Sequence, residues 1–270
     1  MIKRLLFYVG LLALLAVVLF PLYWVIVTSF KTTRDAFAIP PVWIFQPTLD
    51  NFRNAIAHPN FLRAFANSFL ISISSSLIAV AIAALAAYGL VQQDMRRRRN
   101  MEKFILSLRI APALIFVIPV YYFAARVGAL NKHWLLIAVY AFINIPFAIS
   151  LLITFFDDIP PELRDAARVD GARERSIFFR IYMPAARGGV MATLILCVLF
   201  TWNEFFVALT LSGRNTQTLP VSVTSFLTFQ GIQWGALTAA ATLIMLPMLV
   251  LGLLVQGQIV RGMTLGSVKG

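Results

Sequence analysis

Charged residues and cysteine are both scarce in this chain of 270 residues. Only 13% of the residues are charged whereas 60% are hydrophobic, so the chain has too little polar surface to enclose its apolar side chains in water. Its single cysteine, Cys197, excludes an intramolecular disulfide framework and a cysteine-rich metal site. The mean hydropathy of +0.83 indicates that the solvent of this protein is lipid.

Six segments are apolar enough and long enough to cross a bilayer, which takes roughly 20 helical residues. They lie near residues 5–30, 65–91, 105–125, 134–156, 190–211 and 236–258. The first follows Lys3 and Arg4 as a signal peptide would, but its apolar stretch continues to Phe30 without a small-residue cleavage site, which favours a retained anchor. We therefore expect an all-α integral membrane protein with six transmembrane helices in a single transmembrane domain over residues 1–270.

Lysine and arginine are distributed unevenly between the connecting segments. The amino terminus, the 92–104 and 157–189 loops and the tail carry 15 of them, whereas the 31–64, 126–133 and 212–235 loops carry 7. The positive-inside rule therefore predicts that both termini are cytoplasmic. The net charge of +12 then reflects a membrane surface rather than a nucleic-acid partner. The run from Arg96 to Arg99 is interpreted mainly as a topology signal, with docking to a partner or a lipid headgroup as the alternative.

The sequence also lacks the residues that an ATPase or a metalloenzyme needs. It has no G-x-x-x-x-G-K-[ST] phosphate loop and no catalytic constellation, so we expect no enzymatic activity and no cofactor bound by this chain. Its two histidines, His58 and His133, fall in separate outward loops. They are expected to be polar surface residues rather than metal ligands or parts of a proton relay.

The 157–189 cytoplasmic loop is longer than a simple connection requires, and it contains helix signals. Asp158 is a potential N-cap, Pro161 suits a first helical turn, Glu162 and Asp165 favour the positive amino-terminal end, and Gly171 can close the carboxyl end. The pattern predicts a short helix that projects from the membrane and lies parallel to it.

Small and charged residues suit this helix to a protein surface. Ala166 and Ala167 would let another backbone approach closely, and the charges on either side would fix its orientation in a partner's groove. The loop contains six arginines and six acidic residues, so it is not simply a lipid-binding patch. The alternative is an interfacial helix that shields the base of the bundle.

The same loop resembles a known family signature. Asp165-Ala166-Ala167, three residues, Gly171, nine residues, then Ile181-x-Met183-Pro184 is similar to the EAA signature of ABC-importer permease subunits, Glu-Ala-Ala-x3-Gly-x9-Ile-x-Leu-Pro. Asp165 and Met183 are conservative departures from it. The resemblance implies that an ATPase is contacted through Glu162, Asp165, Ala166, Ala167, Asp170, Gly171, Ala172 and Pro184.

Further segments resemble carbohydrate importer permeases of the maltose-transporter type, in particular their second permease. They are Ser29-Phe30-Lys31, Pro40-Pro41-x-Trp43, Asn51-Phe52, Asn67-Ser68, Ala86-Ala87-Tyr88, Trp202-Asn203-Glu204 and the tail from Arg261 to Gly270. The resemblance implies a type I importer permease of the bacterial inner membrane, which pairs with a homologous but distinct permease. It also implies a cytoplasmic ATPase dimer that holds ATP and Mg, and a periplasmic or surface solute-binding protein that delivers a sugar.

Polar residues inside the predicted spans are candidates for the translocation path. Glu204 and Asn203 lie in the outer part of the fifth span, where they would bind sugar hydroxyls or pair with the partner permease. Asn144, beside Pro146 in the fourth span, marks a break whose freed carbonyls need partners or line a watery cavity.

The third span is interrupted by Arg109, Pro112 and Pro119. Arg109 lies at its cytoplasmic start, where the long side chain would extend to the headgroups. Two other functions remain open on the residues alone. One is a secondary transporter driven by an ion gradient, with Glu204 as the titrating group, and the other is a non-transporting membrane assembly protein.

Overall fold

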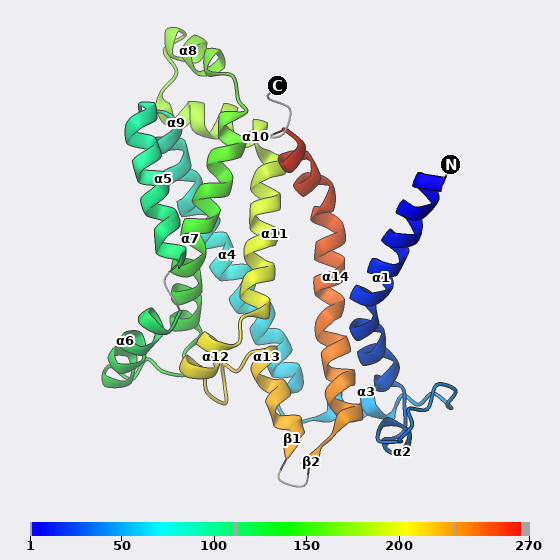
Figure 1. Cartoon of the computed structure of the whole chain (residues 1–270). Coiled ribbons are helices and arrows are strands. Elements are labelled where there is room, and N and C mark those ends of the chain that lie inside the picture. The colour runs from blue at the N-terminus through cyan, green and yellow to red at the C-terminus, as the bar shows by residue number, and fades with distance from the viewer. Residues whose placement is uncertain (1, 111–112, 229–230, 266–270) are drawn as a thin grey trace. The chain divides into compact units, whose positions relative to one another are not determined.

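The computed structural model describes residues 2–110, 113–228 and 231–265, and it is mostly helical (Figure 1). Pro112 and the end of the tail, 266–270, therefore lie outside the described residues, as does the side chain of Arg109. The chain forms two compact units. Unit 1 is Met1–Leu62 with Leu219–Pro247, and unit 2 is Arg63–Thr218 with Met248–Gly270.

Unit 1 combines a long apolar helix with short elements. These are α1 (Ile2–Ser29), α2 (Thr33–Ala36), α3 (Asp50–Ala57), α13 (Leu219–Ser222), a 3-10 turn (Val223–Phe226), β1 (Leu227–Thr228), β2 (Gly231–Ile232) and the first part of α14 (Trp234–Leu265). The two strands pair antiparallel, with Leu227 opposite Ile232. In Figure 1 the hairpin and the start of α14 lie at one end of this unit.

A buried asparagine and a buried lysine fasten the end of α1. Asn51 of α3 donates from Nδ2 to the carbonyls of Ser29 and Lys31, at 2.9 and 2.7 Å. Lys31 is 1% exposed, and its ammonium lies 4.5 Å from the centre of the Trp24 ring, close enough for a cation–π interaction. The chain after α1 is therefore fixed to the helix by bonds that do not depend on a charged partner.

Unit 2 is a helical bundle with short helices at both ends (Figure 1). Its elements are α4 (Phe61–Val91), α5 (Met95–Ile110), α6 (Ala113–Arg126), α7 (His133–Asp157), α8 (Pro161–Val169), α9 (Glu174–Ile177), a π-helical turn (Phe178–Tyr182), α10 (Met183–Ala185), α11 (Arg187–Asn203), α12 (Phe206–Leu211) and the last part of α14. Helix α7 packs against both α5 and α11. The short helices α8 to α10 lie at one end of the bundle, and α6 and α12 lie at the other.

The apolar spans agree with the sequence prediction in part. Helices α1, α4, α7 and α14 are long and apolar enough to cross a membrane. The segment predicted as the fifth span, 190–211, is not one helix, because α11 ends at Asn203 and the chain turns before α12 begins. The predicted third span, 105–125, is shared between α5 and the shorter apolar α6 on either side of the undescribed residues 111–112. The number of six spans stays a prediction.

A glycine lets α11 pack closely against α7. A Cβ at Gly189 would overlap the ring of Phe155, whereas a Cβ at neighbouring Gly188 would meet nothing within 4 Å. We expect Gly189→Ala to destabilise the protein by about 1–2 kcal/mol through overpacking. Gly188→Ala is the matched control, and its better helix propensity should leave stability unchanged or raised by up to about 1 kcal/mol. Thermal unfolding in detergent measures both, and equal behaviour of the two variants would contradict this packing account.

Candidate functional site

The projecting helix predicted in the 157–189 loop is α8, Pro161–Val169. Pro161 lies in its first turn, as predicted, because proline has no N–H to leave unpaired there. Gly171 closes the helix at φ +78, and a Schellman motif forms when Ala172 N donates to Ala167 O. The proposed capping role of Asp158 was wrong. Pro160 precedes the helix without a side-chain cap bond, and Asp158 instead ends α7.

Helix α8 has two different faces. On the outer face Leu163 and Val169 are 50% and 88% exposed, and Ala166, between them at helical spacing, is exposed as well. On the inner face Ala167, together with Ala172 beyond the helix, packs against the hydrophobic cluster at this end of unit 2. The two alanines of the signature therefore differ, because only Ala166 is available to another protein without disturbing this chain.

The other predicted contact residues surround the exposed face. The structure leaves Glu162, Asp165, Asp170, Gly171 and Pro184 exposed, and it leaves Ala167 and Ala172 partly buried. Among the described residues of unit 2, no element covers this apolar stripe and the carboxylates that flank it. Such a surface suits a protein partner that offers an apolar groove edged with basic groups.

A hydrogen-bonded network joins α8 to α4. Glu174 accepts a 2.6 Å bond from the Tyr88 hydroxyl of α4 and a 2.7 Å bond from Nε of Arg168, the penultimate residue of α8. Arg168 also donates to Gln92 Oε1 at 2.9 Å. Tyr88 itself packs against the rings of Phe178 and Tyr182. A movement of α8 would therefore be transmitted to α4 through Glu174. The sequence alone did not indicate this link.

Because of this network, the stability of the loop depends on pH. The hydrogen bond from Tyr88, followed by the Arg168 guanidinium, holds the pKa of the Glu174 carboxyl below its ordinary value, and Glu174 in turn raises the pKa of Arg168. A carboxyl with a lowered pKa in the folded state contributes stability above its unfolded pKa, and that stability is lost as the pH falls through the folded value. The pairing is therefore complete at neutral pH.

We expect Glu174→Gln to lower the unfolding temperature at pH 7, because the neutral amide cannot pair with the Arg168 cation. The difference from the unaltered protein should shrink as the pH falls below the ordinary range of a glutamate and should vanish below the folded pKa. Thermal unfolding scans at several pH values measure it. Glu162→Gln, on the exposed face of the same helix, should show no such pH-dependent difference, and a similar loss there would contradict the role of the network.

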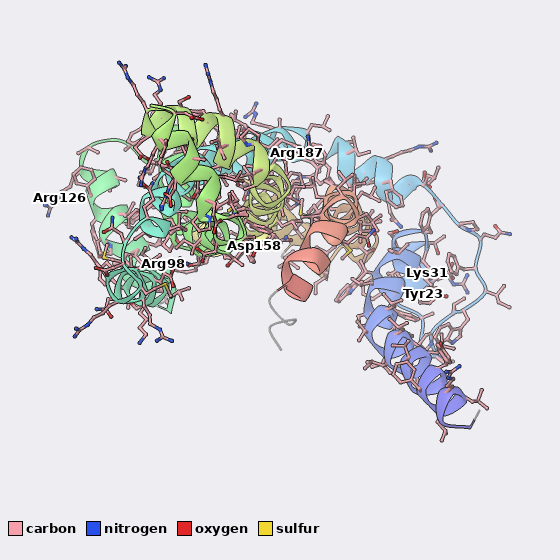
Figure 2. The ribbon with its side chains drawn as sticks, turned by 90° about the horizontal axis from the view of Figure 1, so that it is seen from above. Tyr23, Lys31, Arg98, Arg126, Asp158 and Arg187 are labelled. Carbon is pink, nitrogen blue, oxygen red and sulfur yellow. The ribbon has the colours of Figure 1, made fainter. Side chains whose placement is uncertain are left out.

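The arginine run at the same end of the bundle is not uniform. Arg98, labelled on α5 in Figure 2, forms a bidentate pair with Asp157 at the end of α7. It also donates to Glu102 at 2.6 Å, and its side chain is only 13% exposed. The bond to Asp157 raises the pKa of Arg98. Arg96, Arg97 and Arg99 are exposed. One residue of the run therefore links α5 to α7. The other three are free to contact the membrane surface or a partner.

Glu204, the carboxylate within the predicted fifth span, lies in the break between α11 and α12. Its two carboxylate oxygens accept hydrogen bonds from the N–H groups of Phe206, Val207 and Ala208 at 3.0–3.4 Å. The Tyr140 hydroxyl of α7 donates to Oε2 at 2.8 Å. The carboxylate thus caps α12 and ties it to α7, which explains why the predicted fifth span is broken here.

The two asparagines predicted for the translocation path differ in their surroundings. Asn144 is buried and donates to Thr201 Oγ1 at 2.7 Å, so it links α7 to α11. Asn203 is exposed, and its Nδ2 donates to the carbonyl of Leu199 one turn earlier at 2.8 Å. Within unit 2, Asn203 is the predicted residue that retains polar surface for a ligand or a partner.

At the end of unit 2 opposite α8, a polar network joins two loops. Asn67 donates to the carbonyls of Asn215 and Gln217, and His133 Nε2 lies 2.8 Å from Asn67 Oδ1. Asn131 accepts from the backbone of Asn215 at 3.2 Å. His133 is therefore half-buried and bonded within the bundle, rather than a plain surface residue as predicted.

Comparison with known proteins identifies the family. The sequence matches the family described as the inner membrane component of binding-protein-dependent transport systems over residues 79–265, well over half of the chain. This chain belongs to that family. The matched region of the permease includes α8 and the whole 157–189 loop.

Individual relatives extend the match over nearly the full chain. The permease is 37% identical to the probable ABC transporter permease protein y4oR of Sinorhizobium fredii, across 94% of this chain and 91% of that protein. It is 32% identical to the diacetylchitobiose uptake system permease protein DasC of Streptomyces coelicolor, across 93% and 92%. The resemblance to ABC-importer permeases is confirmed.

A solved structure confirms the fold. A chain of a bacterial ABC transporter involved in import of the acidic polysaccharide alginate superposes with a TM-score of 0.78 at 18% identity, covering 95% of this permease and 96% of that chain. The fold is therefore that of a type I ABC importer permease. The permease is the membrane subunit of such an importer.

Proposed function

We propose that this permease forms one half of a sugar translocation path and is moved by a separate ATPase that grips α8. The observation that carries the proposal is the outer face of α8, on which Leu163, Ala166 and Val169 stand exposed in a loop matched to the family. Because the inner face is held to the bundle through Glu174, a partner on the outer face would move α8 and α4 together.

The proposed partners supply the functions and contact surfaces that this chain does not provide itself. ATP and Mg would be held by a cytoplasmic ATPase dimer, because no phosphate loop occurs in this sequence and the chain itself is proposed to be non-enzymatic. A homologous but distinct permease would complete the path. The long apolar window of α1 has none of its residues buried within this chain, which supports contact with lipid or with that second permease. A periplasmic binding protein would deliver the substrate.

The orientation is proposed from the charge count and is supported by the bundle of unit 2. The 92–104 and 157–189 segments, both predicted to be cytoplasmic, meet where Arg98 binds Asp157. The 126–133 and 212–218 segments, both predicted to be outward, meet where Asn131 binds Asn215 at the opposite end. Each end of the bundle thus gathers loops that the positive-inside rule assigns to one side, with both termini in the cytoplasm.

A sugar or sugar derivative is the proposed substrate class, in line with relatives named for diacetylchitobiose and alginate. Asn203 would face the path, and Asn144 and Glu204 would shape its wall by holding α7, α11 and α12 in place.

Isolation of the permease from its native membrane tests the proposal. An ATPase and a second permease should co-purify, and reconstituted vesicles should take up a sugar only when the binding protein and ATP are supplied. Uptake abolished by a protonophore but insensitive to ATP depletion would overturn the proposal in favour of an ion-driven transporter. Purification without any ATPase would indicate an assembly protein.

A further inference from the structure

A polar pocket of about 500 Å³ lies in unit 1, where α2, α3, β2 and the start of α14 meet. Its volume falls within the range of sites for small molecules. The segments that line it belong to loops predicted to face outward, the side on which a binding protein would release a sugar.

The floor of the pocket is a fixed hydrogen-bond acceptor. Asn51 is 8% exposed, and its Nδ2 is committed to two backbone carbonyls, which fixes the direction of the amide. Among the described residues nothing donates to its Oδ1. A Cβ at Gly235 would overlap this amide, so the glycine leaves the space that the Asn51 side chain occupies. An acceptor in the pocket lining that has no protein donor can take a hydrogen bond from a ligand hydroxyl.

The walls supply the other chemistry that a saccharide ring requires. Asn54 and Gln233 line the pocket with side-chain amides that, within the described part of the chain, form no hydrogen bond. Each amide offers both a donor and an acceptor, as a sugar hydroxyl does. Trp234 and Phe37 are also among the lining residues, and both are exposed. Flat aromatic faces pack well against the apolar C–H face of a pyranose.

The charge of the lining restricts the ligand further. None of the described residues that line the pocket is charged. Recognition of a carboxylate or a phosphate normally uses arginine or lysine. The pocket therefore suits an uncharged sugar better than an acidic one.

We propose that this pocket is an entry subsite for a neutral saccharide ring, separate from the translocation path in unit 2. The proposal rests on the proposed import of a sugar and on the outward placement of these loops. Asn51 Oδ1 would accept from one hydroxyl, Asn54 and Gln233 would bind others, and the indole of Trp234 would support the ring.

Saturation-transfer NMR on the assembled transporter in lipid nanodiscs, without binding protein, tests the subsite with maltose as the probe. We expect saturation of the maltose ring protons. Trp234→Ala should weaken binding about tenfold, through the loss of its packing surface. Asn54→Ala should weaken it roughly two- to tenfold, as expected for one neutral hydrogen bond. The acidic analogue maltobionate should bind more weakly than maltose.

The control is Trp134→Ala in unit 2, because Trp134 is 59% exposed and does not line the pocket. Equal weakening by Trp134→Ala, tighter binding of maltobionate, or no saturation transfer to maltose would overturn the subsite. The subsite would also be overturned if the pocket variants no longer captured the binding protein but bound maltose with unaltered affinity. The pocket would then be a docking surface for that protein. Co-purification and ATP-dependent uptake in the same preparations report on the proposed function independently, so each idea can fail alone.

Discussion

Ala166→Asp should abolish capture of the ATPase while leaving the permease folded. The methyl group of Ala166 lies on the outer face of α8 between two exposed apolar residues, and no described side chain of unit 2 covers it. Burial of a carboxylate without a partner in a protein contact costs about 3 kcal/mol or more, which corresponds to roughly a hundredfold weaker association. Co-purification of the ATPase and ATP-driven uptake should both be lost.

The matched control for this variant is Ala57→Asp. Ala57 is also exposed near the end of a short helix, but it belongs to α3 in a loop predicted to be outward. The substitution adds the same charge to the same residue type and should leave ATPase capture intact. Retention of both capture and uptake in Ala166→Asp would show that α8 is not the contact.

Ala167→Asp would be a poorer test of the same idea. Ala167 packs against the hydrophobic cluster that contains Phe156 and Tyr182, so an aspartate there would disturb the permease itself. Loss of ATPase binding in that variant would not distinguish a lost contact from a displaced helix. The different surroundings of two consecutive alanines thus determine which substitution is informative.

Features that depend on residues close together in the sequence could be predicted, whereas contacts between residues far apart in the sequence could not. Helix α8 was predicted well because its signals are local: Pro161 sets the first turn and Gly171 supplies the positive φ that ends it. The spans that became α1, α4, α7 and α14 were predicted because lipid imposes hydrophobicity over each whole helix. Neither inference requires knowledge of which helices are neighbours.

The networks that position the site could not be predicted in this way. Tyr88 and Glu174 are 86 residues apart, and Arg98 and Asp157 are 59 apart, so only the packing of α4, α5 and α7 reveals them as partners. The break at Glu204 was missed because the apolar stretch continues through it. A carboxylate that bonds to the following N–H groups ends one helix and starts another without any change in hydrophobicity.

Glu204→Ala should destabilise the permease by about 3 kcal/mol, the sum of a lost helix cap and a buried Tyr140 hydroxyl left without its acceptor. Tyr140→Phe removes that hydroxyl together with its need for a partner, so it should cost only about 1 kcal/mol. The double variant should then be more stable than the sum of the two single effects predicts, because both remove the same bond. Thermal unfolding in detergent measures all three.

Glu204→Gln separates this structural role from direct contact with the substrate. The glutamine keeps one carbonyl oxygen, which can accept from Tyr140 or from the α12 backbone but cannot replace all the bonds made by two carboxylate oxygens. If Glu204 acts as a cap, Glu204→Gln and Glu204→Ala should lose uptake in proportion to their loss of stability. If instead the carboxylate binds a sugar hydroxyl, Glu204→Gln should unfold at the unaltered temperature yet transport poorly. The hydrogen bonds from Phe206, Val207 and Ala208 favour the first outcome, since they already engage both carboxylate oxygens.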